Sequence, residues 1–459
     1  MGKSGISRCV ASHNRIIFCS TRRGRHKAEV NKLATILRPE LAGRAIRDEG
    51  RRLNAHSQKL QGRFPFLDGL RAFAAVAVML FHFFNHWVSP IHDPLAAILP
   101  ARTQFFLEHA DLGVEVFFVL SGFVIAHSLL GKQVTPNYAR TFILRRSLRL
   151  DPPYWVVIAM SLWLPYLLAP DAAKNLFSGF GGTAGVMVNM FYLPDLLWQP
   201  RIVGVAWTLC LEVQFYLALL FILVVASAMR TVLSDRYQKI ATVVMFTSCA
   251  LLLAYSLHRW FEWGKNDFGG RWFMFFTGVL AYWALVGLLD RRIFLGYLIA
   301  ILALTAVFRE PRASTTLITT LVIYGSAFTG GLQSWLGGRI FQYLGRISYS
   351  LYLVHITVGI AVIHLVMRHS DGSNAAVLLA LAAAISTSIF LADLLNRFVE
   401  APAMRLSKRF KAADQNPVAL VSVIDQPRSR PCLLSPLLLP FANRSGEDSP
   451  PRLICEVPI

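Results

Sequence analysis

The sequence predicts an all-α protein, a polytopic membrane helix bundle of about ten transmembrane helices with disordered basic tails. Hydrophobic residues make up 55% of the 459 residues and charged residues only 16%, whereas roughly a quarter of the residues in a soluble domain are charged. Long apolar stretches separate the charged residues, and several reach the roughly 20 residues that a helix needs to cross a bilayer. A large soluble protein with buried helices would not show this pattern.

Ten apolar segments are candidate membrane spans. They cover residues 68–88, 113–130, 152–169, 207–228, 240–258, 271–289, 292–308, 314–330, 347–367 and 376–397. We therefore predict one transmembrane domain over 64–405. The segment 1–63 is rich in Arg, poor in acidic residues and without an apolar core, and the segment 406–459 contains Pro, Ser and Arg. We therefore predict that both are disordered tails.

The net charge of +20 could suggest a nucleic-acid partner, but half of the 46 lysines and arginines lie in the two tails. Basic tails beside membrane spans indicate topology and attraction to membrane lipids. With the N-terminus inside, the inner connections hold 12 basic residues and the outer connections hold 8. We therefore expect both termini in the cytoplasm and no nucleic-acid partner.

The six cysteines form neither a CxxC pair nor a metal-like cluster. The sequence thus predicts no metal site and no catalytic thiol.

Two ionisable residues interrupt the first span. Arg71 and His82 lie eleven residues apart, which places both on one helical face about 16 Å from each other. Intramembrane ionisable residues are costly and usually functional, and a neutral imidazole can act as a general base. The alternative is a histidine satisfied by a neighbouring helix. His86, one turn further on, is the competing candidate but lies nearer the outer surface.

Glu115 opens the second span from the outer side, and it could orient or charge-balance His82 if the two helices pack together. The alternative is a surface carboxylate at the edge of a span. Gly122, later in the same span, would allow close approach of another helix.

Three arginines, Arg145, Arg146 and Arg149, cluster before the third span. Arginine suits phosphate groups because it forms paired hydrogen bonds, although positive charge at the cytoplasmic side is a sufficient alternative explanation. Within the fourth span, Glu212 is difficult to explain as a lipid-facing residue. Trp207 at its start is equally consistent with an interfacial aromatic residue.

Near the C-terminus, Ser348, Tyr352 and His355 share one helical face because their spacings are four and three. They could form a polar seam between helices or contact a ligand. Pro402, after the last span, is expected to end its helix.

Six motifs occur in a fixed order. They are Leu67 to Ala72 followed by His82, Gly113 to Phe123, Arg145 to Trp155, Trp207 to Tyr216, Ile347 to His355, and Glu400 to Pro402. In this order the chain resembles the acyltransferase-3 family of membrane acyltransferases over about 64–405. That family includes O-antigen, exopolysaccharide and nodulation-factor acetylases. The chain departs from the family pattern at Asp151, Thr208, Cys210 and Val213.

The resemblance implies a bacterial inner-membrane O-acyltransferase. Such an enzyme transfers an acyl group, by default acetyl, from acyl-CoA to a hydroxyl of a cell-surface or lipid-linked carbohydrate, with no permanently bound cofactor. Its catalytic residues would be His82, Glu115 and Arg71, and acyl-CoA would contact Arg145, Arg146, Arg149 and Tyr154. Substrate-binding or structural roles would fall to Trp207, Glu212, Tyr216, Ser348, Tyr352 and His355.

A membrane transporter or flippase of a glycan or acylated small molecule is the alternative, with the intramembrane charges lining its path. Transporters often show paired segments interrupted by Gly or Pro in two halves, and the sequence shows no such repeat. A scaffold that had lost its activity would be expected to lack His82 or the arginines, and both are present. An enzyme is therefore favoured.

Overall fold

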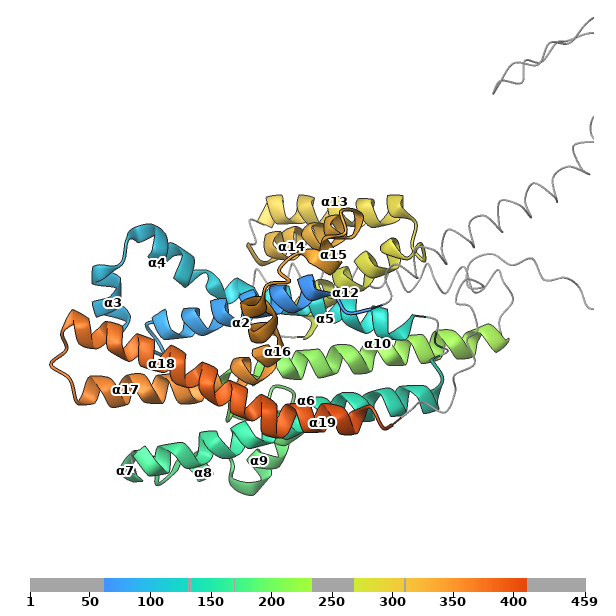
Figure 1. The fold of residues 1–459 in the computed structure, drawn as a ribbon. Helices are drawn as coiled ribbons and strands as arrows, with labels where there is room; N and C mark the ends of the chain where they lie inside the picture. Colours follow the sequence, from blue (N-terminus) through green and yellow to red (C-terminus); the bar gives the residue numbers. More distant parts are fainter. Residues whose placement is uncertain are drawn as a thin grey trace, which may run out of the picture. The chain divides into compact units, whose positions relative to one another are not determined.

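A computed structural model describes residues 62–130, 132, 134–168, 170–232, 268–308 and 311–410. Within these ranges all regular structure is helical and no strand occurs, which confirms the all-α prediction (Figure 1). The predicted tails, apart from their innermost residues, and the predicted span 240–258 lie outside the described residues.

The helices follow one another along the chain with short connections. They are α2 (Pro65–Phe84), α3 (His92–Ile98), α4 (Ala101–Glu108), the 3-10 turn η1 (Ala110–Leu112), α5 (Gly113–Leu129), α6 (Pro136–Leu168), α7 (Pro170–Ala173), α8 (Leu176–Gly179), α9 (Gly182–Met190), the 3-10 turn η2 (Gly204–Ala206), α10 (Trp207–Val232), α12 (Phe268–Leu285), α13 (Arg291–Phe308), α14 (Pro311–Phe328), α15 (Gly331–Ser334), α16 (Arg339–Val354), the π-helical turn η3 (His355–Ile360), α17 (Ala361–Arg368), α18 (Asn374–Leu395), the π-helical turn η4 (Asn396–Glu400) and α19 (Ala401–Ser407).

Within the described residues, helices occupy nine of the ten predicted spans, but the number of transmembrane helices is not confirmed. Five segments are long and apolar enough to cross a membrane: Pro65–Phe84, Ala110–Leu129, Gly204–Ala228, Arg339–Arg368 and Asn374–Ser407. The predicted third span is only the second half of α6, a helix of 33 residues that also contains the arginine run. The charged first half of α6 precedes the apolar run, so a span predicted from apolar residues begins inside this helix.

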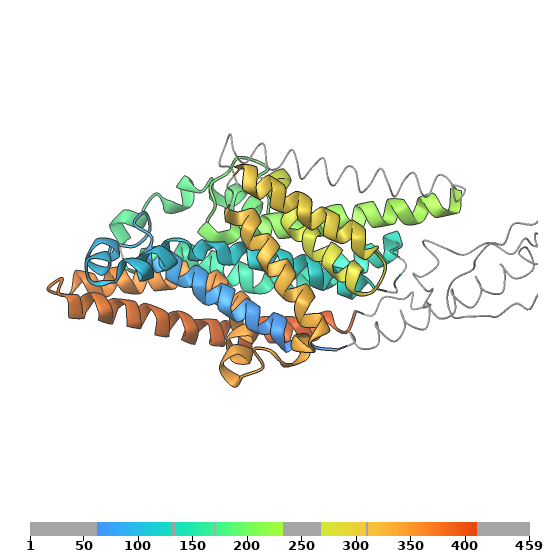
Figure 2. The same cartoon turned by 90° about the horizontal axis from the view of Figure 1, so that it is seen from above.

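The most extensive helix contacts are those of α5 with α12 and of α16 with α2, and Figure 2 shows these elements running beside one another. Glycines allow the first contact. A Cβ atom at Gly122 would lie 1.8 Å from the carbonyl oxygen of Phe275, and one at Gly278 would lie 2.1 Å from that of Val119. The two backbones therefore touch, as small residues permit in membrane bundles, and the predicted role of Gly122 is confirmed.

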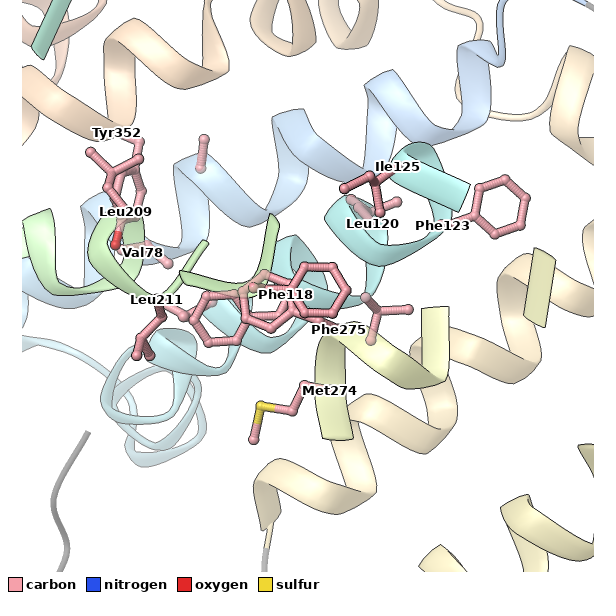
Figure 3. Packing of buried hydrophobic residues seen from close by; sticks show 14 of the residues in the cluster. Val78, Phe118, Leu120, Phe123, Ile125, Leu209, Leu211, Met274, Phe275 and Tyr352 are labelled. Carbon is pink, nitrogen blue, oxygen red and sulfur yellow. The ribbon is translucent and has the colours of Figure 1, made fainter. Parts of the chain in front are cut away.

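Aromatic rings fill the space beside this glycine contact (Figure 3). Phe275 of α12 stacks between Phe118 of α5 and Phe215 of α10, with centroid separations of 4.4 Å and 4.6 Å. All three rings are buried. Offset ring stacks contribute beyond the apolar area that they bury, so this triple stack fixes α10 against the α5–α12 pair.

The expectation that the last helix ends at Pro402 is wrong, because α18, η4 and α19 form a continuous span to Ser407. Pro402 occupies the first turn of α19, where its missing N–H costs little. The preceding π-helical turn buries Glu400, whose Oε2 accepts hydrogen bonds from Ser350 at 2.7 Å and Asn396 at 2.9 Å. Glu400 therefore links α16 to the end of the last span.

Replacing Gly122 with alanine should separate α5 from α12, because the added methyl group meets backbone and not a movable side chain. We expect a loss of about 1–3 kcal/mol in the free energy of unfolding, seen as a lower midpoint in thermal unfolding of the detergent-solubilised protein. Gly325→Ala on α14 is the matched control, since a Cβ atom there meets nothing within 4 Å. Equal midpoints for the two variants would contradict the contact.

Candidate functional site

His82 of α2 and His355 of η3 form a pair, although they are 273 residues apart in the chain. The His355 Nε2 atom lies 3.1 Å from His82 Nδ1, and the ring centroids are 5.0 Å apart. His355 is fully buried, whereas His82 retains partial exposure. The structure therefore joins two residues that the sequence placed in separate motifs.

Backbone carbonyl groups decide where the hydrogen atoms of this pair lie. His82 Nδ1 is 2.8 Å from the carbonyl oxygen of Val78, and His355 Nδ1 is 3.1 Å from that of Leu351. A carbonyl oxygen can only accept, so each Nδ1 carries its hydrogen. His355 Nε2 is then unprotonated, and it shares the single His82 Nδ1–H with the Val78 carbonyl oxygen. His82 Nε2 carries the lone pair, which is the tautomer that a general base requires.

A π-helical turn and a glycine bring His355 to this position. His355 is the first residue of η3, and π-helical turns inside α-helices are frequent at functional sites. A Cβ atom at Gly359 in the same turn would lie 2.2 Å from the Phe83 ring of α2. This close approach presses η3 against α2 and places the two imidazoles side by side.

A second polar cluster surrounds Glu212 of α10. Its Oε1 atom accepts hydrogen bonds from Ser121 Oγ of α5 at 2.8 Å and from the Tyr216 hydroxyl. The guanidinium group of Arg146 stands over the Tyr216 ring, 4.9 Å from its centroid. Glu212 thus does not face lipid. Its carboxylate joins α10 to α5, and Arg146 of α6 contacts the same cluster through the Tyr216 ring.

Arg71 of α2 belongs to the same cluster. It lies within electrostatic range of Arg149, Tyr216 and Glu212, and its Nη1 atom is 3.6 Å from Asp68 Oδ1. Arginines therefore outnumber carboxylates in this cluster. Such an arrangement suits an anion that offers several oxygen atoms, and a phosphate is the usual example.

Only part of the predicted arginine run reaches the cluster. Arg146 and Arg149 are half-buried and three residues apart, so they share one face of α6. Arg145 is exposed. The helical register, which turns adjacent residues by about 100°, separates Arg145 from its neighbour.

A small cavity adjoins Arg146 between α6, α9 and α10. It has a volume of about 130 Å³, and its polar lining comes from Arg146, Ser147, Asp151, Tyr192 and Tyr216. Asp151 accepts hydrogen bonds from Ser147 and from the Tyr192 hydroxyl at 2.9 Å. Asp151 departs from the family pattern, and these contacts give it a local role.

Tyr154, expected to contact acyl-CoA, is fully buried and stacks on Tyr192 at a centroid separation of 5.0 Å. Its contacts are those of a core residue.

Tyr352 lies near the histidine pair, with its ring 5.8 Å from that of His355 and its hydroxyl 2.8 Å from Thr208 Oγ1. Ser348 donates to the carbonyl oxygen of Gly345 within its own helix. This hydrogen bond does not join Ser348 to another helix.

Glu115 has partners other than the expected His82. Its Oε1 atom is 2.7 Å from Arg271 Nη1 and 2.8 Å from Arg312 Nη1, and Arg312 also contacts Asp111 at 3.0 Å. Both Glu115 and Arg271 are essentially inaccessible to solvent. The first helix packs on one side of α5, but Glu115 points toward α12 and α14. The expectation about its partner is therefore corrected.

Arg271 and Arg312 were not singled out from the sequence, although each carries a detectable signal. Arg271 is a lone cation at the start of an apolar span, and Arg312 precedes another. Such residues usually pair inside a bundle. The guanidinium group of Arg271 also stands 5.2 Å from the centroid of Trp207, which gives Trp207 a partner inside the bundle.

The acyltransferase-3 family model, described as an acyltransferase domain, matches residues 64–396. This is well over half of the chain and includes both polar clusters. The chain belongs to the acyltransferase-3 family. Membership confirms the resemblance that the six ordered motifs indicated, and it assigns the histidine pair and the arginine cluster to the family's shared domain.

Several curated proteins are similar to this family member. The putative peptidoglycan O-acetyltransferase YrhL of Bacillus subtilis is 25% identical over 342 residues, 66% of this chain and 50% of that protein. Peptidoglycan O-acetyltransferase OatA of Listeria monocytogenes is 31% identical over 163 residues, 33% of this chain and 23% of OatA. Nodulation protein 10 of Rhizobium leguminosarum is 30% identical over 189 residues, 36% of this chain and 45% of that protein.

The chain thus spans half or less of the length of these three relatives. No solved structure matches it.

Replacing Glu115 with glutamine should destabilise this acyltransferase-3 domain, because two arginines would then face a neutral amide inside the bundle. Breaking a buried ion pair costs about 3–5 kcal/mol, so we expect a clear loss of thermal stability in detergent. Asp171→Asn is the control, since the Asp171–Lys174 pair is largely exposed and should contribute little. Unchanged stability of the Glu115 variant would show that the network does not hold the bundle.

Proposed function

We propose that this protein is an integral membrane O-acyltransferase that moves an acetyl group from acetyl-CoA to a hydroxyl of a cell-surface or lipid-linked carbohydrate. The observation that carries the proposal is the His82–His355 pair, which leaves His82 Nε2 as the basic nitrogen. The names of the two similar peptidoglycan O-acetyltransferases support acetyl as the acyl group and a carbohydrate as the acceptor.

The arginine cluster supports acyl-CoA as the donor. Arg71 of α2 lies within electrostatic range of Glu212, Tyr216 and Arg149, and Arg146 of α6 stands over the Tyr216 ring. The phosphates of acyl-CoA would supply the negative charge that this cluster attracts. Arg71 and His82 share one face of α2 about 16 Å apart. An extended donor held by the arginines would therefore reach toward His82 with its thioester end.

In a direct transfer, His82 Nε2 removes the proton from the acceptor hydroxyl. The hydroxyl oxygen then attacks the thioester carbonyl, the carbon–sulfur bond breaks, and the departing CoA sulfur takes the proton from His82. His355 holds the His82 ring in the required tautomer through the 3.1 Å contact. Glu115 has no direct part in this step, because its carboxylate is paired with Arg271 and Arg312 inside the bundle.

The basic tails support a topology with both termini in the cytoplasm of a bacterial inner membrane. The arginine cluster lies toward the N-terminal end of α2 and would then face the cytoplasm, where acyl-CoA is present. The C-terminal end of α2 would face the opposite side, where a surface carbohydrate is built. Transfer at His82 therefore occurs between the two aqueous phases.

Replacing His82 with alanine removes the proposed base. We expect acetyl transfer by the purified protein to fall by about 10²–10⁴-fold, measured by mass spectrometry of the acetylated acceptor. His369→Ala is a matched control, because His369 makes the same bond to a carbonyl four residues earlier but is exposed. Retained transfer in the His82 variant, with normal folding, would remove His82 from the reaction.

The arginine run offers a test with its own internal control. Arg146→Ala and Arg149→Ala should each raise the apparent KM for acetyl-CoA by about tenfold or more, since a hydrogen bond to a charged group contributes about 1.5–3 kcal/mol. Arg145→Ala removes the same charge from an exposed position of the same helix and should change KM little. Equal effects of all three substitutions would reduce the run to a topology signal.

A further inference from the structure

A larger cavity lies at the C-terminal end of α2, on the opposite side of His82 from the arginine cluster. Figure 1 shows α3 and α4 beside this end of α2. The cavity has a volume of about 300 Å³, at the lower end of the roughly 300–1,000 Å³ range of small-molecule sites. Its lining consists of Phe81, Phe84, Asn85, His86, Trp87, His92 and Glu108.

Aromatic rings form a continuous chain along this cavity. The ring of His92 lies 4.9 Å from that of Phe84 and 5.5 Å from that of His86, and His86 in turn lies 4.3 Å from Trp87. Trp87 is 85% exposed, so one face of its indole is open to a ligand. An open aromatic face packs well against the C–H face of a sugar ring, because both surfaces are rigid and weakly polar.

Polar groups of both kinds surround these rings. Asn85 Oδ1 accepts from the Trp87 backbone N–H at 2.9 Å, so the Asn85 amide nitrogen is directed to donate elsewhere. His92 Nδ1 donates to Asp93 at 2.8 Å, so in the neutral imidazole the Nε2 atom is an acceptor. Glu108 adds a carboxylate. Hydroxyl groups both donate and accept, so the lining matches a polyol.

We propose that this cavity is the acceptor subsite and binds one uncharged sugar ring. The ring stacks on Trp87, and its hydroxyl groups bond to Asn85, His92 and Glu108. The Glu108 carboxylate disfavours sugar acids. This inference rests on the proposed function, because a bound hydroxyl must reach His82, which lies two residues before the end of α2 and next to Phe81 of the cavity lining.

The position of the cavity relative to His82 supports this assignment. Phe81 lines the cavity, and its ring lies 5.1 Å from the His82 ring. The sugar would thus enter from one end of α2 and the thioester from the other. Trp87 could instead be an interfacial aromatic residue, since such residues are also exposed at the end of a span. That role does not require a carboxylate and two imidazoles around the same cavity.

The test is a binding measurement that needs no turnover. Saturation-transfer NMR in detergent would follow maltotriose and a trisaccharide of N-acetylglucosamine as neutral probes, with a galacturonic acid trisaccharide as the charged comparison. We expect the wild type and His82→Ala to bind a neutral probe and to reject the acid. Trp87→Ala and His92→Ala should weaken binding at least tenfold. Trp163→Ala, which removes another exposed indole on α6, should bind as the wild type does.

Steady-state kinetics distinguish a failure of the proposed acceptor subsite from a failure of the proposed acetyl transfer. In a transferring enzyme, Trp87→Ala should raise the KM for the saccharide at least tenfold while the KM for acetyl-CoA changes less than twofold. Wild-type binding that Trp87→Ala and His92→Ala do not weaken, or no binding of either neutral probe, would overturn the subsite even if transfer occurs. Binding that depends on Trp87 without any acetyl transfer would support the subsite and contradict the proposed function.

Discussion

The bundle depends on the pairing of charges that lie inside it. Glu115 and Arg271 are both removed from solvent, and an unpaired ion in that position would cost several kcal/mol. Because Arg312 shares the same carboxylate, one buried atom ties together α5, α12 and α14. The direct backbone contact at Gly122 brings α5 and α12 close enough for this pairing. The position of α5 in turn determines which side chains of other helices its own side chains can contact.

The polar cluster around Glu212 depends on where α5 lies. Ser121 extends from α5 to Glu212 of α10, and Arg71 of α2 lies within electrostatic range of the same carboxylate. Arg146 of α6 stands over the ring of Tyr216, whose hydroxyl donates to Glu212. The histidine pair depends on a different contact, that of α2 with the π-helical turn at His355. Both sites therefore share α2, with arginine toward its first turns and histidine toward its last.

This arrangement along one helix gives the proposed reaction a direction. A donor with phosphates suits one end of α2, and a neutral polyol suits the aromatic cavity at the other end. His82 lies between the two, with its reactive nitrogen set by Val78 and His355. A bilayer that separates the two substrates would make such a division useful, because neither substrate has to cross the membrane completely.

The sequence by itself determined the features that depend on local periodicity. Apolar runs of about 20 residues with few charges predict membrane helices, and a spacing of eleven residues places Arg71 and His82 on one helical face whatever the neighbours are. The ordered motifs identified the family for the same reason, because each motif is contiguous. Tertiary structure decided the partners: His355 for His82, and Arg271 with Arg312 for Glu115. Those contacts join residues more than 150 positions apart, and close helix approach and π-helical turns, which no periodic pattern contains, bring them together.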